Sequence, residues 1–410
     1  MCVIAHKYPK DDPVAIPDSI KDLSLSHVTA GFVAVLVGFS SSVVIILQAA
    51  ESAGANAAQV SSWIWALGLG MGLTSAGLSL YFKEPVLTAW STPGAALLVT
   101  SLSGFSLEQA TAAFIFAALL TIVVGWTGWF ERILKHLPQS LAAAMLAGIL
   151  FQFGLDAFVA LEGSFLLVGL MLVTYVISRQ LLPRYAILLV LAVGMLVAGL
   201  QGRLHWDGLE LAFAEPQFVW PDFSLPVLIS VGVPLFIVTM TSQNVPGLAV
   251  LRANGFRTPL SPVLTVTGVA TLLLAPFGGY AFNLAAITAA ICMGEEAGEK
   301  KSARYLAAVC AGVVYILVGL FGATVVALFA AFPKAFVVAL AGLALLGTIG
   351  NSLHAALDDT EGREAALITF LVTVSGVTLW GVGAAFWGLV AGLLVRLVMN
   401  LGLQKTAIKK

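Results

Sequence analysis

Residues 85–97 read PVLTAWSTPGAAL, and residues 276–288 read PFGGYAFNLAAIT. Each interrupts an apolar stretch with a polar and aromatic run, and each then continues as small residues typical of a short helix. Thr92 and Asn283 are good N-cap residues, and Pro93 suits the first helical position, where a missing N–H costs nothing. Irregular backbone within a membrane is tolerated only where it lines a cavity, so the matched interruptions predict the substrate site of a transporter.

The composition of the 410-residue chain is that of a membrane protein. Hydrophobic residues make up 60%, charged residues 10%, and the mean hydropathy is +1.00. These values predict an all-α polytopic membrane protein in the lipid bilayer, with no nucleic-acid partner. The three cysteines lack metal or redox spacing, and the sequence contains no catalytic motif such as a His-Glu-x-x-His pair. We therefore expect no enzyme, no metal site and no cofactor.

A hydropathy window of about 19 residues predicts fourteen membrane segments. Segments three and ten, at 86–102 and 280–293, contain the interruptions and are too short to cross as helices, so each is expected to be a short strand followed by a half-helix. The other segments are expected near 28–50, 60–82, 108–128, 138–159, 163–181, 185–201, 226–250, 259–276, 303–331, 335–353, 364–380 and 384–402.

The placement of lysine and arginine orients these segments. With the N-terminus in the cytoplasm, eighteen of the twenty basic residues fall inside, and only Arg203 and Lys334 fall outside. This bias follows the positive-inside rule, and adding or dropping one segment would destroy it. Residues 1–26 are polar and lack a cleavage site after the first apolar run, so they are expected to be a cytoplasmic segment and not a signal peptide. Both termini are predicted to be cytoplasmic.

An odd number of segments in each half requires the second half to be inverted in the membrane. The pattern Leu-Ala-Gly recurs at 146–148 and 340–342, with nearly the spacing that separates the two interruptions. We therefore expect two inverted seven-segment repeats. The first repeat would cover 27–203, an outer connector 204–225, and the second repeat 226–403.

Three motifs resemble the benzoate:proton symporter (BenE) family of bacterial inner membranes: WSTPG at 90–94, TSQNVPG at 241–247 and FGGYAFNLAAITAAIC at 277–292. The resemblance implies the seven-plus-seven inverted repeat of nucleobase–ascorbate transporters and sulfate permeases. It also implies a core domain of segments 1–4 and 8–11, a gate domain of segments 5–7 and 12–14, and a substrate between half-helices three and ten. The core would be about 27–128 and 226–331, and the gate about 130–203 and 334–403. A homodimer through the gate domain is compatible with this family.

One departure from the nucleobase relatives suits an anionic substrate. Those relatives carry glutamates in segments eight and ten, where this chain has Gln243 and Asn283. A benzoate-type carboxylate, with a pKa of about 4.3 like that of a glutamate, is ionised at neutral pH, and a fixed glutamate would repel it. Helix N-termini attract an anion by roughly 0.3–2 kcal/mol. Desolvation costs several kcal/mol, so direct hydrogen bonds are needed as well.

The candidate substrate-binding residues come from both interruptions and from segments one and eight. They are Phe39, Trp90, Ser91, Thr92, Gly94, Gln243, Asn244, Tyr280, Phe282, Asn283, Leu284 and Ala285. Alternative structural roles remain open: Gln243 and Asn244 suit hydrogen bonds between helices, and the aromatic residues suit a core or a lipid-facing surface.

Three ionisable residues near segment ends are candidate proton carriers. Glu51 and Asp156 lie near outer ends, and His354 lies near an inner end. We predict a secondary active transporter that imports benzoate or a similar aromatic monocarboxylate with a proton, by elevator-type alternating access. A co-transported proton removes the cost of about 2.3 kcal/mol per 100 mV for importing an anion. The alternatives are a permease of the same fold for another small anion or a nucleobase and, less favoured, an anion channel.

Overall fold

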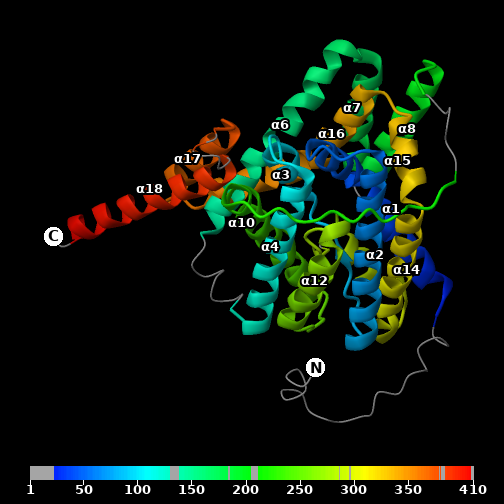
Figure 1. Ribbon diagram of the computed structural model, residues 1–410, viewed down its shortest axis with the longest axis horizontal. Helices are drawn as coiled ribbons and strands as arrows, with labels where there is room; N and C mark the ends of the chain where they lie inside the picture. The colour runs from blue at the N-terminus through cyan, green and yellow to red at the C-terminus, as the bar shows by residue number, and fades with distance from the viewer. Residues whose placement is uncertain are drawn as a thin grey trace, which may run out of the picture.

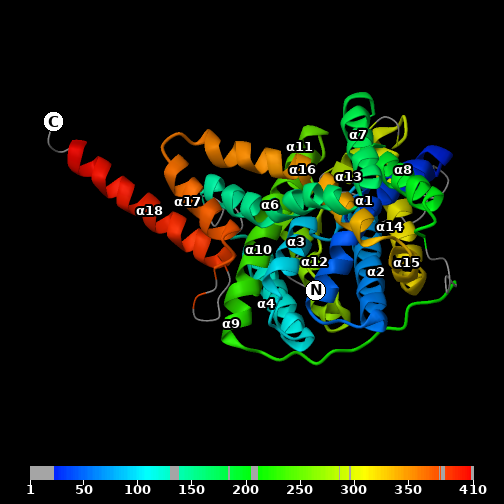
Figure 2. The same ribbon diagram turned by 90° about the horizontal axis from the view of Figure 1, so that it is seen from above.

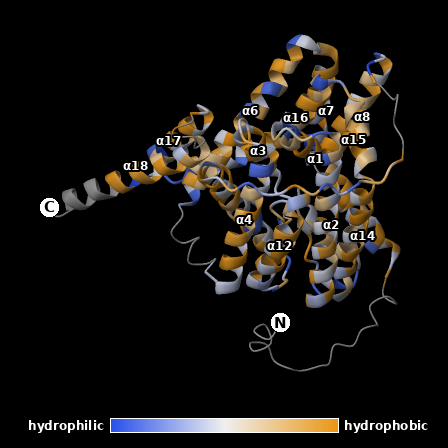
Figure 3. Cartoon of the chain, viewed as in Figure 1, coloured by the Kyte–Doolittle hydropathy of each residue, from blue (hydrophilic) through white to orange (hydrophobic). Residues whose placement is uncertain are grey.

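The computed structural model describes residues 23–129, 138–182, 185–204, 211–285, 287–294, 297–377, 379 and 384–407. The predicted cytoplasmic segment lies mostly outside these residues, as does part of the predicted connector. Within them, seven helical stretches are long and apolar enough to cross a membrane, and the bent helix α1 would be an eighth. The protein is a mostly helical polytopic membrane protein, and hydrophobic residues predominate along its helices (Figure 3).

The elements follow the predicted segments closely in position. The first half contains α1 (Leu25–Ser52), α2 (Ala57–Phe82), β1 (Thr88–Ala89), α3 (Thr92–Ser101), α4 (Leu107–Thr127), α6 (Gln139–Gly163), α7 (Phe165–Leu181) and α8 (Ala186–Leu200). The second half contains α9 (Leu225–Val227), η3 (Leu228–Gly232), α10 (Val233–Thr239), η4 (Met240–Asn244), α11 (Val245–Ala253), α12 (Leu260–Leu274), η5 (Ala275–Phe277), β2 (Asn283–Leu284), α13 (Ile287–Met293), η7 (Lys301–Ala303), α14 (Tyr305–Leu320), α15 (Gly322–Ala330), α16 (Lys334–Asp358), α17 (Arg363–Val374) and α18 (Ala384–Ala407).

The helices pack as two groups (Figures 1 and 2). In the first group, which we define as α1–α4 with α9–α15, α2 packs on α14 and α4 packs on α12. In the second group, α6–α8 with α16–α18, α6 packs on α16 and α17. Small residues bring backbones together in the first group: a Cβ added at Gly68 would lie 2.6 Å from the Cα of Gly319. Close backbone approach of this kind stabilises helix pairs in lipid, where no hydrophobic force drives association.

Two predicted segments differ from the observed helices. The stretch predicted at 303–331 is broken at Phe321 into α14 and α15, because the backbone at Phe321 leaves the helical region while Gly319 and Gly322 stay tight against α2. The stretch predicted at 364–380 is helical only to Val374, because Gly376 follows in the left-handed conformation that ends helices.

The two interrupted stretches lie side by side as a two-stranded antiparallel pair. Ala89 pairs with Asn283, and Thr88 pairs with Leu284. The buried Thr88 hydroxyl also bonds to the hydroxyls of Thr74, at 2.6 Å, and Ser75, at 2.8 Å, so α2 holds β1 in place. The strand pair therefore fixes where α3 and α13 begin relative to each other.

The helix caps differ from those expected. Ser91, not Thr92, is the N-cap of α3: its Oγ accepts a hydrogen bond from the N–H of Gly94 at 3.0 Å. Thr92 and Pro93 are then the first two helical residues, a position that also tolerates proline. Asn283 is not a cap, because it belongs to β2, four positions before α13 begins.

The predicted segment 226–250 is one continuous helical rod with two π-helical turns, η3 and η4. Each turn lies just before a proline, at Pro234 and Pro246. A proline ring offers no N–H and clashes with the carbonyl four residues earlier, so the helix widens there. The second widening, η4, contains Gln243 and Asn244.

Polar contacts at the end of α16 hold the second group together. The Asp359 carboxylate accepts hydrogen bonds from Ser140 of α6, at 3.3 Å, and from Arg396 of α18, at 3.0 Å. The backbone N–H of Gly362, followed by the nearby Arg396 guanidinium, lowers the pKa of Asp359 below its usual value, so this carboxylate stays ionised at neutral pH.

Candidate substrate site

A cavity of about 1170 Å³, which we call the main cavity, lies between the two helix groups. Its lining includes residues of α1, α3, α6, α7, α8, η4, α13, α14 and α16. Its polar side chains are Ser42, Thr92, Gln139, Arg179, Thr241, Ser242, Gln243, Thr288, Tyr315, Thr348, Asn351 and Ser352. Among the described residues, this lining holds one charged side chain and no carboxylate.

Trp90 gives the cavity an aromatic wall of fixed orientation. Its indole N–H donates to the Ser42 hydroxyl at 2.8 Å, and that hydroxyl donates in turn to the Gly38 carbonyl at 2.9 Å. The Phe39 ring packs on Trp90 with a centroid distance of 5.2 Å. Of the aromatic residues predicted for the site, Trp90 lines the cavity and Phe39 supports it from behind.

The start of α3 presents one hydroxyl and one backbone donor to the same cavity. Thr92 lines it, and within the described part of the chain neither its N–H nor its hydroxyl has a hydrogen-bond partner. Pro93 has no N–H, and the N–H of Gly94 is taken by Ser91. The free donors at the start of α3 are therefore the N–H and the hydroxyl of Thr92, at the positive end of the helix dipole.

Gln243 reaches the cavity from the widened turn η4, and Ala285 lines it just after β2. The Gln243 amide has no hydrogen-bond partner among the described residues, so its N–H groups are available to a ligand. The neighbouring Asn244 is turned away and fully buried, and its Oδ1 accepts the backbone N–H of Leu284 at 3.0 Å. Asn244 therefore ties η4 to β2.

Replacing Asn244 with Leu is expected to lower the free energy of unfolding by about 1–3 kcal/mol, because the buried N–H of Leu284 would lose its acceptor. Thermal unfolding in detergent measures the loss. Gln243→Leu is the matched control, since its side chain has no hydrogen bond to lose, and it should unfold nearly as the parent does. Parental stability of Asn244→Leu would contradict the tie between η4 and β2.

The remaining predicted residues lie behind the cavity wall. Tyr280 packs between Trp63 and Phe114, with ring distances of 5.7 and 5.2 Å, and Phe282 packs against Gly70. Ser91, Gly94, Asn283 and Leu284 are buried and outside the lining. The Oδ1 of Asn283 and the hydroxyl of Tyr280 have no hydrogen-bond partner within the described part of the chain.

The lining also contains residues that the sequence did not single out as site residues. Arg179 is the most informative of them, because in the sequence it is only one of the eighteen basic residues on the predicted cytoplasmic side. Gln139, Thr348 and Asn351 come with it from the second helix group. In the sequence, each of them is a polar residue near one end of an apolar segment. Many residues at a membrane surface share this feature, so it does not identify a cavity residue.

A second pocket, of about 400 Å³, lies farther along the same helices and contains two of the three candidate proton carriers. Glu51 of α1 and Asp156 of α6 line it, and the Gln152 amide donates to Asp156 at 2.7 Å. The third candidate, His354, is exposed and lines neither pocket.

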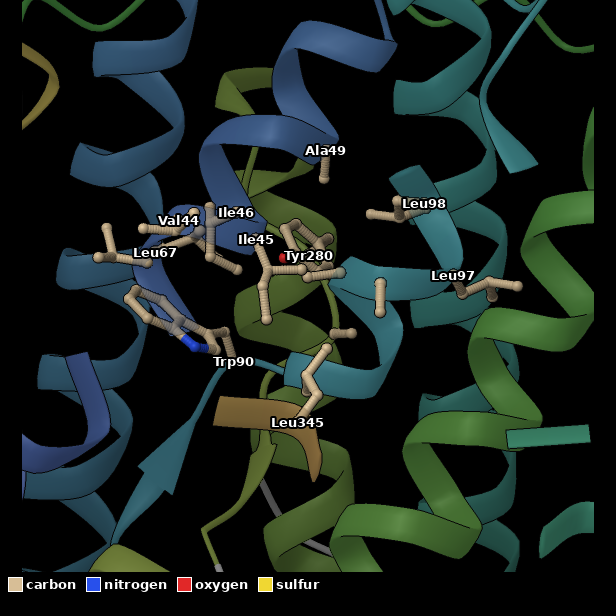
Figure 4. Packing of buried hydrophobic residues seen from close by; sticks show 14 of the residues in the cluster. Val44, Ile45, Ile46, Ala49, Leu67, Trp90, Leu97, Leu98, Tyr280 and Leu345 are labelled. Carbon is tan, nitrogen blue, oxygen red and sulfur yellow. The ribbon is translucent and has the colours of Figure 1, made fainter. Parts of the chain in front are cut away.

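A buried apolar layer separates the two pockets. On α1 it consists of residues 43–47, on α3 of residues 95–98, and on α6 it includes Ile149 and Leu150. Figure 4 shows Ile45, Leu97 and Leu98 of this layer near Trp90 and Tyr280. The main cavity is open on its other side, where Arg179 and Asn351 are exposed. A cavity open on one side and closed on the other is the arrangement of a membrane transport protein.

The comparisons with known proteins agree with this class. Residues 21–398 match the family described as "Benzoate membrane transport protein" (BenE). "Inner membrane protein YdcO" of Escherichia coli is 49% identical over 91% of this chain and 95% of its own length. "Benzoate membrane transport protein" of Acinetobacter baylyi is 44% identical over 92% of this chain and 96% of its own length. The chain therefore belongs to the benzoate membrane transport family; its relatives are named as membrane proteins and not as enzymes.

Solved structures share the fold at low sequence identity. The structure of SLC26A9 superposes with a TM-score of 0.62 at 13% identity, covering 94% of this chain and 67% of that one. The transmembrane domain of the cyanobacterial bicarbonate transporter BicA superposes with a TM-score of 0.52 at 14% identity, covering 92% of this chain and 97% of that domain. At such identities the likeness concerns the fold alone.

Proposed function

We propose that this protein is a secondary active transporter that imports benzoate, or a similar aromatic monocarboxylate, together with a proton across the bacterial inner membrane. The observation that carries the proposal is the main cavity: an oriented tryptophan, unpaired donors at Thr92 and Gln243, and a lining without a carboxylate among the described residues. Such a lining suits a flat apolar ring with one negative group. The relative named for benzoate supports the same substrate class.

The transport cycle that we propose is of the elevator type. The first helix group serves as the core domain and the second as the gate domain, within two inverted seven-segment repeats whose third and tenth segments are broken. Both termini are placed in the cytoplasm, which makes the open side of the main cavity the cytoplasmic side. Movement of the core past the gate would carry the substrate across the apolar layer. Apolar side chains of α18, such as Leu394 and Leu397, are exposed and would be covered in a homodimer that forms through the gate domain.

Two routes for the proton are compatible with this cycle. With no described carboxylate in the main cavity, the proton is carried either at Glu51 or Asp156, beyond the apolar layer, or by the substrate as the neutral acid. The absence of a described acid from the cavity also favours an anion over a nucleobase. A different small anion remains the second candidate, because the fold is shared with a bicarbonate transporter.

Uptake into proteoliposomes tests the proposal. Labelled benzoate should accumulate when the outside is made acidic with no membrane potential imposed, and a proton ionophore should abolish the accumulation. Protein-free vesicles must be measured in parallel, because neutral benzoic acid crosses lipid by itself. Uracil is the matched comparison and should not accumulate.

Two results would contradict the proposal. Accumulation that ignores the proton gradient but follows a sodium gradient would exclude proton symport. Uptake of uracil with no uptake of benzoate beyond that of protein-free vesicles would exclude the aromatic acid as substrate.

A further inference from the structure

The charge of the main cavity comes from the gate side alone. Arg179 is the one charged residue in the described lining, and it lies in the last turn of α7, in the second helix group. The proposed contacts of the substrate at Thr92 and Gln243 lie in the first group. Within the described residues, the Arg179 guanidinium has no ion pair and no hydrogen bond. A guanidinium without a protein partner at the open side of the cavity can bind an anion through its planar fork of N–H donors.

A glycine on the neighbouring helix makes room for this guanidinium. A Cβ added at Gly347 of α16 would lie 3.1 Å from Nη2 of Arg179 and 3.6 Å from its Cζ. Glycine inside a helix lowers its stability by about 1 kcal/mol relative to alanine. The close approach of the guanidinium is a physical reason for glycine at position 347 despite this cost. Asn351 is four residues further along α16, on the same helix face, and it also lines the cavity. The guanidinium therefore lies against α16 at Gly347, one helical turn from Asn351.

We propose that Arg179 is a further anion-binding group of the main cavity, which holds the carboxylate from the gate side together with the donors on the core side. This inference rests on the proposed function, because it takes the substrate to be a carboxylate. The planar guanidinium binds a carboxylate through two parallel hydrogen bonds. Ligand pockets of roughly 300–1000 Å³ hold a drug-sized molecule. The 1170 Å³ of this cavity therefore accommodate one small aromatic acid between the two helix groups.

If Arg179 has only a structural role, replacing it should leave the affinity for benzoate unchanged. A basic residue in the last turn of a helix stabilises the helix dipole and marks the cytoplasmic end, with no contact to substrate. Arg252 provides the matched control, because it is exposed in the last turn of α11 and does not line the main cavity. Arg252→Gln removes the same charge from an equivalent helix position.

The first test measures equilibrium binding of benzoate and of its neutral analogue benzamide to purified full-length protein at pH 7. Arg179→Gln is expected to weaken benzoate binding by roughly tenfold to a hundredfold and to leave benzamide binding unchanged. Arg252→Gln should bind both ligands as the parent does. If Arg179→Gln binds benzoate like the parent, Arg179 is not an anion position. If the parent itself binds no benzoate, the proposed function fails first, and this inference fails with it.

A second measurement on the unmodified protein avoids any folding defect of the variant. Phenylglyoxal modifies exposed arginines, and mass spectrometry reports the rate at each one. Benzoate is expected to slow modification of Arg179 severalfold and to leave Arg252 unchanged, whereas benzamide should protect neither. Equal rates at Arg179 with and without saturating benzoate would overturn the proposal.

Discussion

Gln243→Glu is expected to weaken benzoate binding by a few hundredfold at pH 7 and by less than about tenfold at pH 5. The Gln243 amide faces the main cavity without a partner among the described residues, so the parent can donate an N–H to the carboxylate. A glutamate at that position offers only acceptors when ionised. The bound substrate would then meet a like charge instead of a donor.

The size of the effect and its pH dependence follow from the pKa of the new carboxyl group. Two like charges about 5 Å apart repel by about 3 kcal/mol at an effective dielectric constant of 20. Protonating a glutamate of pKa 4.3 at pH 7 costs about 3.7 kcal/mol, which sets an upper limit of about 500-fold on the loss. At pH 5 the same protonation costs only about 1 kcal/mol, and the neutral carboxyl can donate a hydrogen bond again.

Two controls separate charge from position in a binding titration at both pH values. Gln243→Leu removes only the hydrogen bond, so its loss should be smaller and independent of pH. Gln48→Glu places the same charge on α1 in the second pocket, beyond the apolar layer, and should bind benzoate as the parent does. Equal affinity of Gln243→Glu and the parent at pH 7 would remove Gln243 from the site.

Hydropathy and the paired interruptions predicted the positions of nearly all helices, because burial in lipid dictates apolar segments of a given length. The local geometry was less predictable. Ser91 and Thr92 are both good N-caps, and a following proline is accepted at the first or the second helical position. The pairing of Ala89 with Asn283 decides between them, and this is a contact between distant parts of the chain.

The same limit applies to the site. Trp90, Thr92, Gln243 and Ala285 do line the main cavity, whereas Asn244, adjacent to Gln243 in the sequence, points into the core. Which of two adjacent polar residues faces the cavity depends on the π-helical turn η4, and no periodicity in the sequence reports that turn. Arg179 was visible as a charge at a segment end, but its place in the lining depends on how α7 packs against α16.

Phe282→Ala is expected to lower the free energy of unfolding by about 3–5 kcal/mol while leaving the benzoate affinity of the folded protein within about twofold of the parent. The Phe282 ring is 1% exposed, and its tip fills the space over Gly70, where an added Cβ would lie 2.1 Å from Cζ. Truncation would leave a cavity between α2 and the loop before β2, because neither the strand pair nor the glycine-packed helices can collapse into it.

Titration with sodium dodecyl sulfate in mixed micelles measures the stability, and a binding isotherm on the folded variant measures the affinity. Phe39→Ala is the matched control: its half-buried ring supports Trp90 at the cavity wall, so it should lose less stability and more affinity. The opposite result for Phe282→Ala, parental stability with benzoate binding lost, would mean that this ring stacks on the substrate. The cavity wall would then have to include the loop before β2, and the substrate would lie deeper between α2 and β2 than the main cavity reaches.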